Sequence, residues 1–251
     1  MISLGGKRAL VTGGSRGIGA ATALLLAQCG ADVAIGYRSR RSDAESVAAR
    51  VRGFGVRAAA FATDVAARDG ADVLVERAAE ALGGLDIFVG NAGIWPADEM
   101  ALADMSDDRW RRTVAQNLDS IFFTCRAAAG RIERGGRLVL VASTAGQRGE
   151  PFHADYAATK GAVISLTKSL AGELASREVT VNCVAPGWVD TEMCAEPYAN
   201  GGRERIAATI PLGRVACPED IAGPIVFLCS PLARHVTGEI LNVNGGSVLC
   251  G

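Results

Sequence analysis

Three side chains between Ser143 and Lys160 have the types and the spacing needed to move a proton. Tyr156 and Lys160 are four residues apart, so they lie on one face if this alanine-rich segment is helical. A free tyrosine ionises near pH ~10, and a neighbouring ammonium favours the phenolate. We therefore expect Lys160 to lower the pKa of Tyr156, which would then serve as a general acid or base.

Ser143 follows the apolar run 137–142, which is typical of a buried strand. At the end of that strand its hydroxyl could hold a substrate oxygen. The Tyr-x-x-x-Lys spacing is common by itself, and the alternative is a buried tyrosine on an ordinary helix. His153 is interpreted as a specificity residue or a bystander rather than a catalyst. The residues after Ser143 that could face the substrate are Gln147, Glu150, Phe152, His153 and Asp155.

A glycine-rich turn separates an expected strand, 7–12, from a segment with apolar residues at helical spacing, 18–29. Glycines let a backbone approach phosphate closely, and the free N–H groups at a helix start attract negative charge. The spacing is Gly-x-x-x-Gly-x-Gly, which differs from the Gly-x-Gly-x-x-Gly pattern of many dinucleotide sites. We expect a pyrophosphate at this turn, and a purely structural turn is the alternative.

Taken together, the motifs resemble the short-chain dehydrogenase/reductase family over nearly the whole chain and in the family's order. They are Thr12-Gly-Gly-Ser-Arg-Gly-Ile-Gly19, Asn91-Ala-Gly93, Asn117, Ser143, Tyr156 with Lys160, and Pro186-Gly187. The resemblance implies that Tyr156 is the general acid/base and that Ser143 orients and polarises a carbonyl. It also implies that Lys160 lowers the pKa of the tyrosine and holds the nicotinamide ribose.

Asn117 lies in an expected long helix, 107–132, where asparagine is unfavourable because its side chain competes for backbone groups. The resemblance implies that the helix is kinked at Asn117 and that the residue supports a proton-relay water. An ordinary buried amide is the alternative.

The second expected strand, 32–37, ends without the Asp or Glu that binds the 2′-hydroxyl of NAD. Arginines are present instead, and charge-assisted hydrogen bonds contribute roughly 1.5–3 kcal/mol each. NADP(H) is therefore expected in preference to NAD(H). The alternative is a solvated basic helix start, to which Arg40 and Arg41 are assigned. The residues expected near the phosphate are Arg16, Tyr37, Arg38 and Ser39.

Further cofactor contacts follow from the resemblance. Asp64 and Val65 would bracket the adenine, although Asp64 could equally cap the next helix. Asn91, Ala92 and Gly93 would let the backbone pass near the cofactor, with Asn91 first of all a structural tie between strands. The nicotinamide would be held by Pro186, Gly187, the amide of Val189 and the hydroxyl of Thr191. The glycine turn would contribute Gly13, Ser15, Arg16, Gly17, Ile18 and Gly19.

Residues 193–214 lose regular apolar spacing, which predicts a long loop of the kind that closes over a substrate. The lid is expected to span about 188–214. Trp188, Met193 and Tyr198 would give it an apolar inner surface. Trp95, in the loop after the expected strand 85–90, is also expected in the substrate pocket, and surface cover is its alternative role.

Strands that alternate with helices predict a single α/β domain with a Rossmann-type, doubly wound parallel sheet of about seven strands, flanked by helices. A chain of 251 residues, 49% of them hydrophobic, is long enough to bury a sizeable core. Gly13, Asn91, Ser143 and Pro186 each follow an expected strand, so they should meet at one edge of the sheet.

Composition narrows the class of partner. A net charge of −1 provides no field for nucleic acid, and no apolar run approaches the ~20 residues that cross a membrane. Seven scattered cysteines, Cys250 among them, suit reduced thiols, and without a signal peptide a cytoplasmic location is expected. The only histidines, His153 and His235, lack the spacing of a zinc site, so no metal is expected.

The expected activity is the NADP(H)-dependent interconversion of a ketone and a secondary alcohol, on a small ketone or an acyl thioester. The resemblance is strongest to the 3-oxoacyl-[acyl-carrier-protein] reductase-like branch, and Arg134 and Arg177 lie near positions with which that branch binds its acidic carrier. The alternatives are a catalytically silent nucleotide sensor and a redox-neutral dehydratase or epimerase. A homodimer or homotetramer is expected, packed through the small, apolar outer face of the helix that runs on to 173, namely Ala157, Val163, Leu170 and Ala171.

Overall fold

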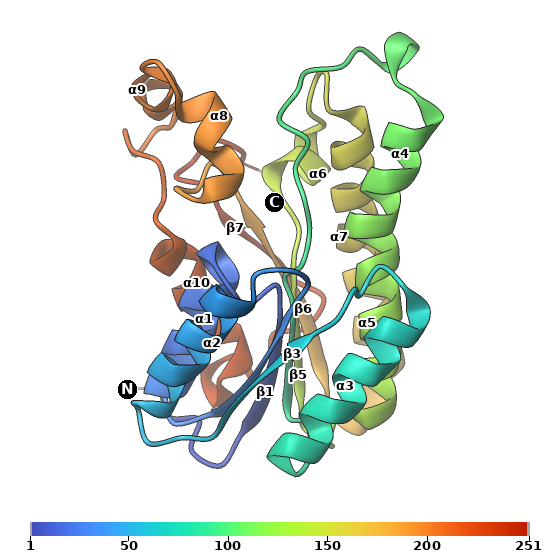
Figure 1. Ribbon diagram of the computed structural model, residues 1–251, viewed down its shortest axis with the longest axis vertical. Helices are drawn as coiled ribbons and strands as arrows, with labels where there is room; N and C mark the ends of the chain where they lie inside the picture. The colour runs from blue at the N-terminus through green and yellow to red at the C-terminus, as the bar shows by residue number, and fades with distance from the viewer. Residues whose placement is uncertain (1, 250–251) are drawn as a thin grey trace.

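The computed structural model describes residues 2–249, which leaves Cys250 outside the described residues. In this part of the chain one parallel sheet of seven strands has the order β3-β2-β1-β4-β5-β6-β7, which confirms the predicted doubly wound fold (Figure 1). The order reverses between β1 and β4, where such sheets bind ligands. The strands are β1 (Arg8–Thr12), β2 (Asp32–Tyr37), β3 (Ala58–Ala62), β4 (Ile87–Gly90), β5 (Arg137–Val141), β6 (Thr180–Pro186) and β7 (Ile240–Val243).

Helices cover both faces of the sheet (Figure 1). One face carries α1 (Gly17–Gln28), α2 (Arg41–Arg52) and α10 (Pro218–Cys229), and the other carries α3 (Arg68–Leu82), α5 (Ser120–Arg131) and α7 (Ala154–Leu174). Shorter helices lie toward the carboxyl ends of the strands (Figure 1). These are α4 (Asp107–Val114), α6 (Thr144–Arg148), α8 (Ala195–Tyr198) and α9 (Gly202–Thr209).

The central strands are buried on both faces, which explains their almost unbroken apolar runs. All four residues of β4 and all seven of β6 are buried. Leu26 and Val226 belong to the core beneath α1 and α10, while Leu74 and Leu138 belong to the core beneath α3 and α5. The rigid sheet therefore fixes where its strand ends lie.

The expected helix over 107–132 is interrupted at its middle. A π-helical turn, Ala115–Asp119, joins α4 to α5, and the amide of Ser120 donates to the carbonyl of Ala115, five residues back. Such turns are rare, and they occur frequently at functional sites. The resemblance implied a kink in the helix at Asn117, and the structure has one π-helical turn at this position.

The expectation of an irregular loop over 188–214 is wrong in part. The segment contains η4 (Glu192–Cys194), α8 and α9. With four and eight residues, the two helices are too short to show a clear apolar period in the sequence. They project at one end of the molecule (Figure 1), and their role as a lid stays a prediction.

The outer face proposed for the helix that runs on to 173 is wrong for two of its four residues, while Ala157 and Leu170 are partly exposed. Val163 and Ala171 are buried in the core of the same chain, with exposed fractions of 0% and 7%, and Leu170 packs against that core. One side of α7 packs on β6 and another on α4, so its apolar residues serve two internal contacts. Among residues 2–249, no helix is long and apolar enough to cross a membrane.

Candidate active site

Two adjoining cavities open at the carboxyl ends of the central strands. The inner cavity is lined by Ser143, Tyr156 and Lys160 together with the indoles of Trp95 and Trp188. The outer cavity extends from the glycine turn to the ends of β2 and β3. The residues that line both cavities are Ile18, Asn91, Gly93, Ile94, Thr191 and Met193.

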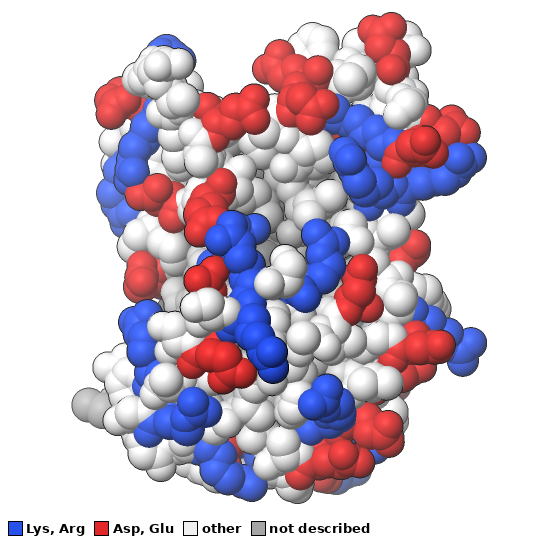
Figure 2. Space-filling view, viewed as in Figure 1, with Lys and Arg blue, Asp and Glu red and all other residues white. Residues whose placement is uncertain are grey.

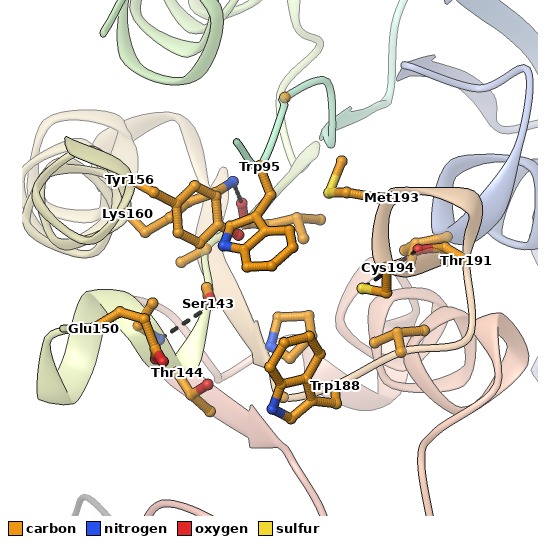
Figure 3. A pocket seen from close by; sticks show the side chains of 18 of the residues that line it. Trp95, Ser143, Thr144, Glu150, Tyr156, Lys160, Trp188, Thr191, Met193 and Cys194 are labelled. Carbon is orange, nitrogen blue, oxygen red and sulfur yellow. Dashed lines mark hydrogen bonds between the residues drawn. The ribbon is translucent and has the colours of Figure 1, made fainter. Parts of the chain in front are cut away.

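The three predicted proton-transfer residues converge on one side of the inner cavity (Figure 3). Ser143 follows β5 and caps α6, its hydroxyl accepting from the amide of Ala145 at 3.1 Å. Tyr156 and Lys160 lie one turn apart on α7. The Lys160 ammonium donates to the carbonyl of Val141 at 2.9 Å and lies 5.7 Å from the centre of the Tyr156 ring.

Burial has the largest effect on the pKa values of Tyr156 and Lys160. It raises the pKa of Tyr156 to about 12, and a hydrogen bond with Ser143 opposes that rise while Cys194 and Glu150 add to it. Burial also lowers the pKa of Lys160 to about 8. The expectation that Lys160 lowers the pKa of Tyr156 is therefore wrong for this structure. The ammonium donates to a backbone carbonyl and lies 5.7 Å from the ring centre, and desolvation of the phenol has the largest effect on its pKa.

Asn117 is fully buried in the π-helical turn and lines neither cavity. Its side-chain oxygen accepts from the amide of Ile94 at 2.7 Å, and its side-chain nitrogen donates to the carbonyl of Ile94 at 2.9 Å. This pair of bonds joins the turn to the loop that carries Trp95. The role in a water relay stays a prediction.

The glycine turn packs tightly against the end of β4. Asn91 donates from its side chain to the carbonyls of Thr12 and Gly13, and its amide donates to the Thr12 hydroxyl at 3.0 Å. A Cβ on Gly19 would lie 2.3 Å from the Gly13 carbonyl oxygen, so only glycine lets α1 start this close. Gly19 packs against Gly13 and Asn91 and does not line the outer cavity. The residues that face the outer cavity are Gly13, Ser15, Arg16, Gly17, Ile18, Asn91, Ala92 and Gly93.

The far end of the outer cavity brings together Tyr37, Arg38, Ser39, Asp64 and Val65. The helix-cap alternative for Asp64 is wrong, because α3 starts at Arg68 with Ala67 as its cap residue. Asp64 instead accepts from the amide of Ala66 at 3.0 Å, in a turn that faces the cavity.

Two charged residues at this end were not expected there. Arg40, assigned to a solvated helix start, lines the outer cavity, and so does Glu192 of η4. Arg40 donates to the Glu192 carboxylate at 2.9 Å, and Arg16 also pairs with that carboxylate. Only the run of three arginines over 38–41 hinted at Arg40. Nothing in the spacing around Glu192 indicates a partner 152 residues away.

The end of β6 and the chain after it form the opposite wall of the inner cavity, with Pro186, Gly187, Val189 and Thr191 in its lining. The Gly187 amide donates to the carbonyl of Val243 at 3.2 Å, which ties this turn to β7. Figure 3 shows Thr191, Met193 and Cys194 across the cavity from Ser143 and Tyr156.

Aromatic side chains line the space between these walls (Figure 3). Trp95 and Trp188 meet edge to face with ring centres 5.7 Å apart, and Met193 is 41% exposed at the rim. His153, expected to face the substrate, is buried behind Trp95 and stacks on it at 4.8 Å. Its place in the substrate pocket is therefore a wrong prediction, because the larger indole covers it.

Of the five residues after Ser143 that were expected to face the substrate, Glu150 alone lines the inner cavity. Arg148, which also lines this cavity, pairs with Glu150 at 3.0 Å. Gln147 donates to Asn242, Asp155 is buried against Arg109, and Phe152 is exposed. Among residues 2–249, no group of three or more His, Cys, Asp or Glu could hold a metal ion.

This fold and site define an oxidoreductase of the nicotinamide-dependent α/β class. The family model described as enoyl-(acyl carrier protein) reductase matches residues 13–247. The 3-oxoacyl-[acyl-carrier-protein] reductase of Synechocystis sp. is 39% identical, with 99% of this chain and 100% of that protein covered. The L-rhamnose 1-dehydrogenase (NAD(P)(+)) of Sphingomonas sp. is 42% identical, over 97% of this chain and 96% of that protein. The chain belongs to the short-chain dehydrogenase/reductase family.

A solved structure agrees with this placement. The short chain dehydrogenase of Burkholderia cenocepacia J2315, crystallised in complex with NADP, has a TM-score of 0.92 and is 38% identical. The similarity covers 97% of this chain and 98% of that one.

Proposed function

We propose that this protein interconverts a ketone and a secondary alcohol with NADP(H) as the hydride carrier. The observation that carries the proposal is the convergence of Ser143, Tyr156 and Lys160 in an inner cavity that opens directly into the arginine-rich outer cavity. A carbonyl compound in the first and a dinucleotide in the second would meet at the shared lining, beside Gly93 and Thr191.

The residues of the outer cavity fit a dinucleotide. The glycine turn leaves room for phosphate beside the start of α1, whose free N–H groups favour an anion. Val189 and Thr191 would hold the nicotinamide, and Asp64 with Val65 would flank the adenine. Arg16, Arg38 and Arg40 give the ribose end a positive charge, which supports NADP(H) over NAD(H).

When bound, the nicotinamide supplies or accepts a hydride at the carbonyl carbon. Tyr156 delivers the proton to the carbonyl oxygen, and the Ser143 hydroxyl donates to that oxygen as negative charge develops on it. Lys160 would hold the ribose, and its charge would favour the phenolate once the phenol gives up its proton. Asn117 would support the water that returns a proton to this group. Trp95 and Trp188, which line the cavity, would limit the access of other water to the carbonyl group.

The test is NADPH oxidation against a panel of small ketones and 3-oxoacyl thioesters, with Tyr156→Phe as the comparison. Positioned proton transfer contributes about 10²–10⁴-fold, so the variant should lose turnover by that factor while it keeps NADPH binding. NADPH binding without turnover by the wild type would favour a nucleotide sensor. Dehydration or epimerisation without net NADPH consumption would favour a redox-neutral enzyme.

The substrate would be a small ketone or an acyl thioester, on a free or a carrier-bound chain. Arg134 and Arg177, expected near a carrier site, are both engaged within the chain. Arg134 pairs with Glu178, and Arg177 donates to the carbonyls of Ala129 and Ile132 at the end of α5. Parallel assays with carrier-bound and free thioesters of one acyl group would show whether the carrier raises kcat/KM.

Two exposed aromatic residues support assembly of this chain into a homo-oligomer. Trp110 on α4 is 40% exposed and Phe122 on α5 is 45% exposed. We propose a dimer or tetramer packed through these helices in the cytoplasm, where the free cysteines would stay reduced. Light scattering of Phe122→Glu should show a smaller particle than the wild type.

A further inference from the structure

Glu192 bridges two arginines that come from distant parts of the chain. Its Oε2 accepts from Arg40 at 2.9 Å and from Arg16, which lie 152 and 176 residues earlier. Arg16 precedes α1, Arg40 precedes α2, and Glu192 opens the short helical turn η4. In the view of Figure 2, basic side chains lie along the middle of the molecule, with acidic side chains among them.

The three residues meet at a defined place in the outer cavity. All of them line it, beside Tyr37 and Ser39 at the end of β2. In doubly wound sheets this strand end lies next to the adenosine ribose, where a carboxylate accepts from the 2′-hydroxyl of NAD. Here the strand end has no carboxylate, and Glu192 brings one to the same region from the segment that follows β6.

A carboxylate in this place acts differently on the two dinucleotides. The 2′-phosphate of NADP would compete with it for Arg16 and Arg40 and would be repelled by it. The uncharged 2′-hydroxyl of NAD meets no such repulsion and can donate to the carboxylate. The side chains of Glu192, Arg16 and Arg40 are 57%, 46% and 50% exposed, so water and salt moderate both effects.

We propose that Glu192 is a specificity-determining residue that lowers the preference for NADP over NAD by competing with the 2′-phosphate for Arg16 and Arg40. The inference rests on the proposed use of a nicotinamide dinucleotide. The preference between NADP and NAD is then determined by the 188–214 segment as well as by the end of β2. Dual use of NAD and NADP is the expected consequence.

The test uses two cofactor fragments that differ only in the 2′-phosphate, 2′,5′-ADP and 5′-AMP, titrated calorimetrically into the protein in 20 mM salt. Glu192→Gln should tighten 2′,5′-ADP binding about fivefold and change 5′-AMP binding less than twofold or weaken it. The gain should shrink in 500 mM salt. Glu196→Gln is the matched control, because it removes the same charge from an exposed position in the same segment.

The outcomes of these titrations distinguish the role of Glu192 from the cofactor assignment. An unchanged or weaker affinity of Glu192→Gln for 2′,5′-ADP, or a gain no larger than that of Glu196→Gln, overturns the role of Glu192 while the proposed function stands. Failure of the wild type to bind either fragment overturns the cofactor assignment itself, and the role of Glu192 with it.

Discussion

The backbone of Gly146 in α6 lies directly against the backbone of Gly161 in α7. A Cβ on Gly146 would come within 2.7 Å of the Gly161 amide nitrogen and 2.5 Å of the carbonyl carbon of Lys160. Ser143 caps α6, while Tyr156 and Lys160 belong to α7. This glycine contact therefore sets the separation between the serine hydroxyl and the phenol.

Gly146→Ala should push α6 away from α7, because the added methyl group meets backbone atoms that cannot rotate away. We expect a loss of about 1–3 kcal/mol in the free energy of unfolding and a fall in kcat of at least about tenfold. Urea unfolding and NADPH oxidation would measure the two effects. Gly172→Ala, where the added Cβ meets nothing within 4 Å, should keep full activity. Wild-type turnover in Gly146→Ala would show that the contact does not position Ser143.

The stability contributed by Lys160 should depend on pH. Burial lowers the pKa of Lys160 from 10.5 to about 8, so between these values the unfolded chain holds a proton that the folded chain lacks. The free energy of unfolding should therefore gain up to about 1.4 kcal/mol per pH unit across this window, and below pH 8 the cost of burying the charge is present in full.

Lys160→Met removes this group, and titrations elsewhere in the chain largely cancel in the comparison. Relative to the wild type, the variant should be more stable at pH 7 than at pH 10, as measured by urea unfolding at several pH values. A stability difference that stays constant over that range would refute the lowered pKa.

A buried ion pair should anchor the start of α7. Asp155 is completely buried, and its Oδ2 accepts from Arg109 at 3.1 Å and from Thr113 at 2.8 Å. Asp155→Asn leaves Arg109 buried without this charge partner, which costs about 3–5 kcal/mol for pairs of this kind. Arg109 also pairs with Asp98, whose side chain is 66% exposed, so Asp98→Asn should cost about 1 kcal/mol or less. Equal losses in both variants would contradict this ranking.

The same aspartate should make stability sensitive to acid. Burial raises the pKa of Asp155, but hydrogen bonds from Thr113, the Tyr156 backbone and Arg109 outweigh it and hold the pKa below its ordinary value. Its contribution is present above pH ~4 and is lost as the pH falls through the folded-state value. The stability gap between the wild type and Asp155→Asn should therefore narrow below pH 4 in acid unfolding curves.

His153 should act on the substrate only through Trp95, on which it stacks. His153→Ala should loosen the indole and raise KM about three- to tenfold, with kcat within twofold of the wild type. His153→Phe restores an aromatic partner and should return KM toward normal. A fall in kcat of a hundredfold, with a changed pH profile, would instead assign proton transfer to the imidazole.

The sheet and the position of the proton-transfer group could be predicted because they depend on local signals. Apolar runs located β1, β2, β4 and β5 within about two residues, and parallel strands must bring their carboxyl ends to one edge. Ser143, Tyr156 and Lys160 accordingly meet in one cavity.

Features that depend on contacts between distant segments were missed. The bridge from Glu192 to Arg16 and Arg40 joins three separate turns, and the burial of His153 depends on which way Trp95 points. The pKa of Tyr156 was predicted in the wrong direction because spacing reveals a neighbouring charge but not the loss of water around the phenol.

The two walls of the inner cavity come from separate parts of the chain. Ser143, Tyr156 and Lys160 are held by β5, α6 and α7, whereas Trp188, Thr191 and Met193 face them from the segment after β6 (Figure 3). Chemistry and substrate choice can thus diverge independently in evolution. Grafting the corresponding segment of a relative onto this scaffold would change which carbonyl compounds are accepted and leave the proton donor in place.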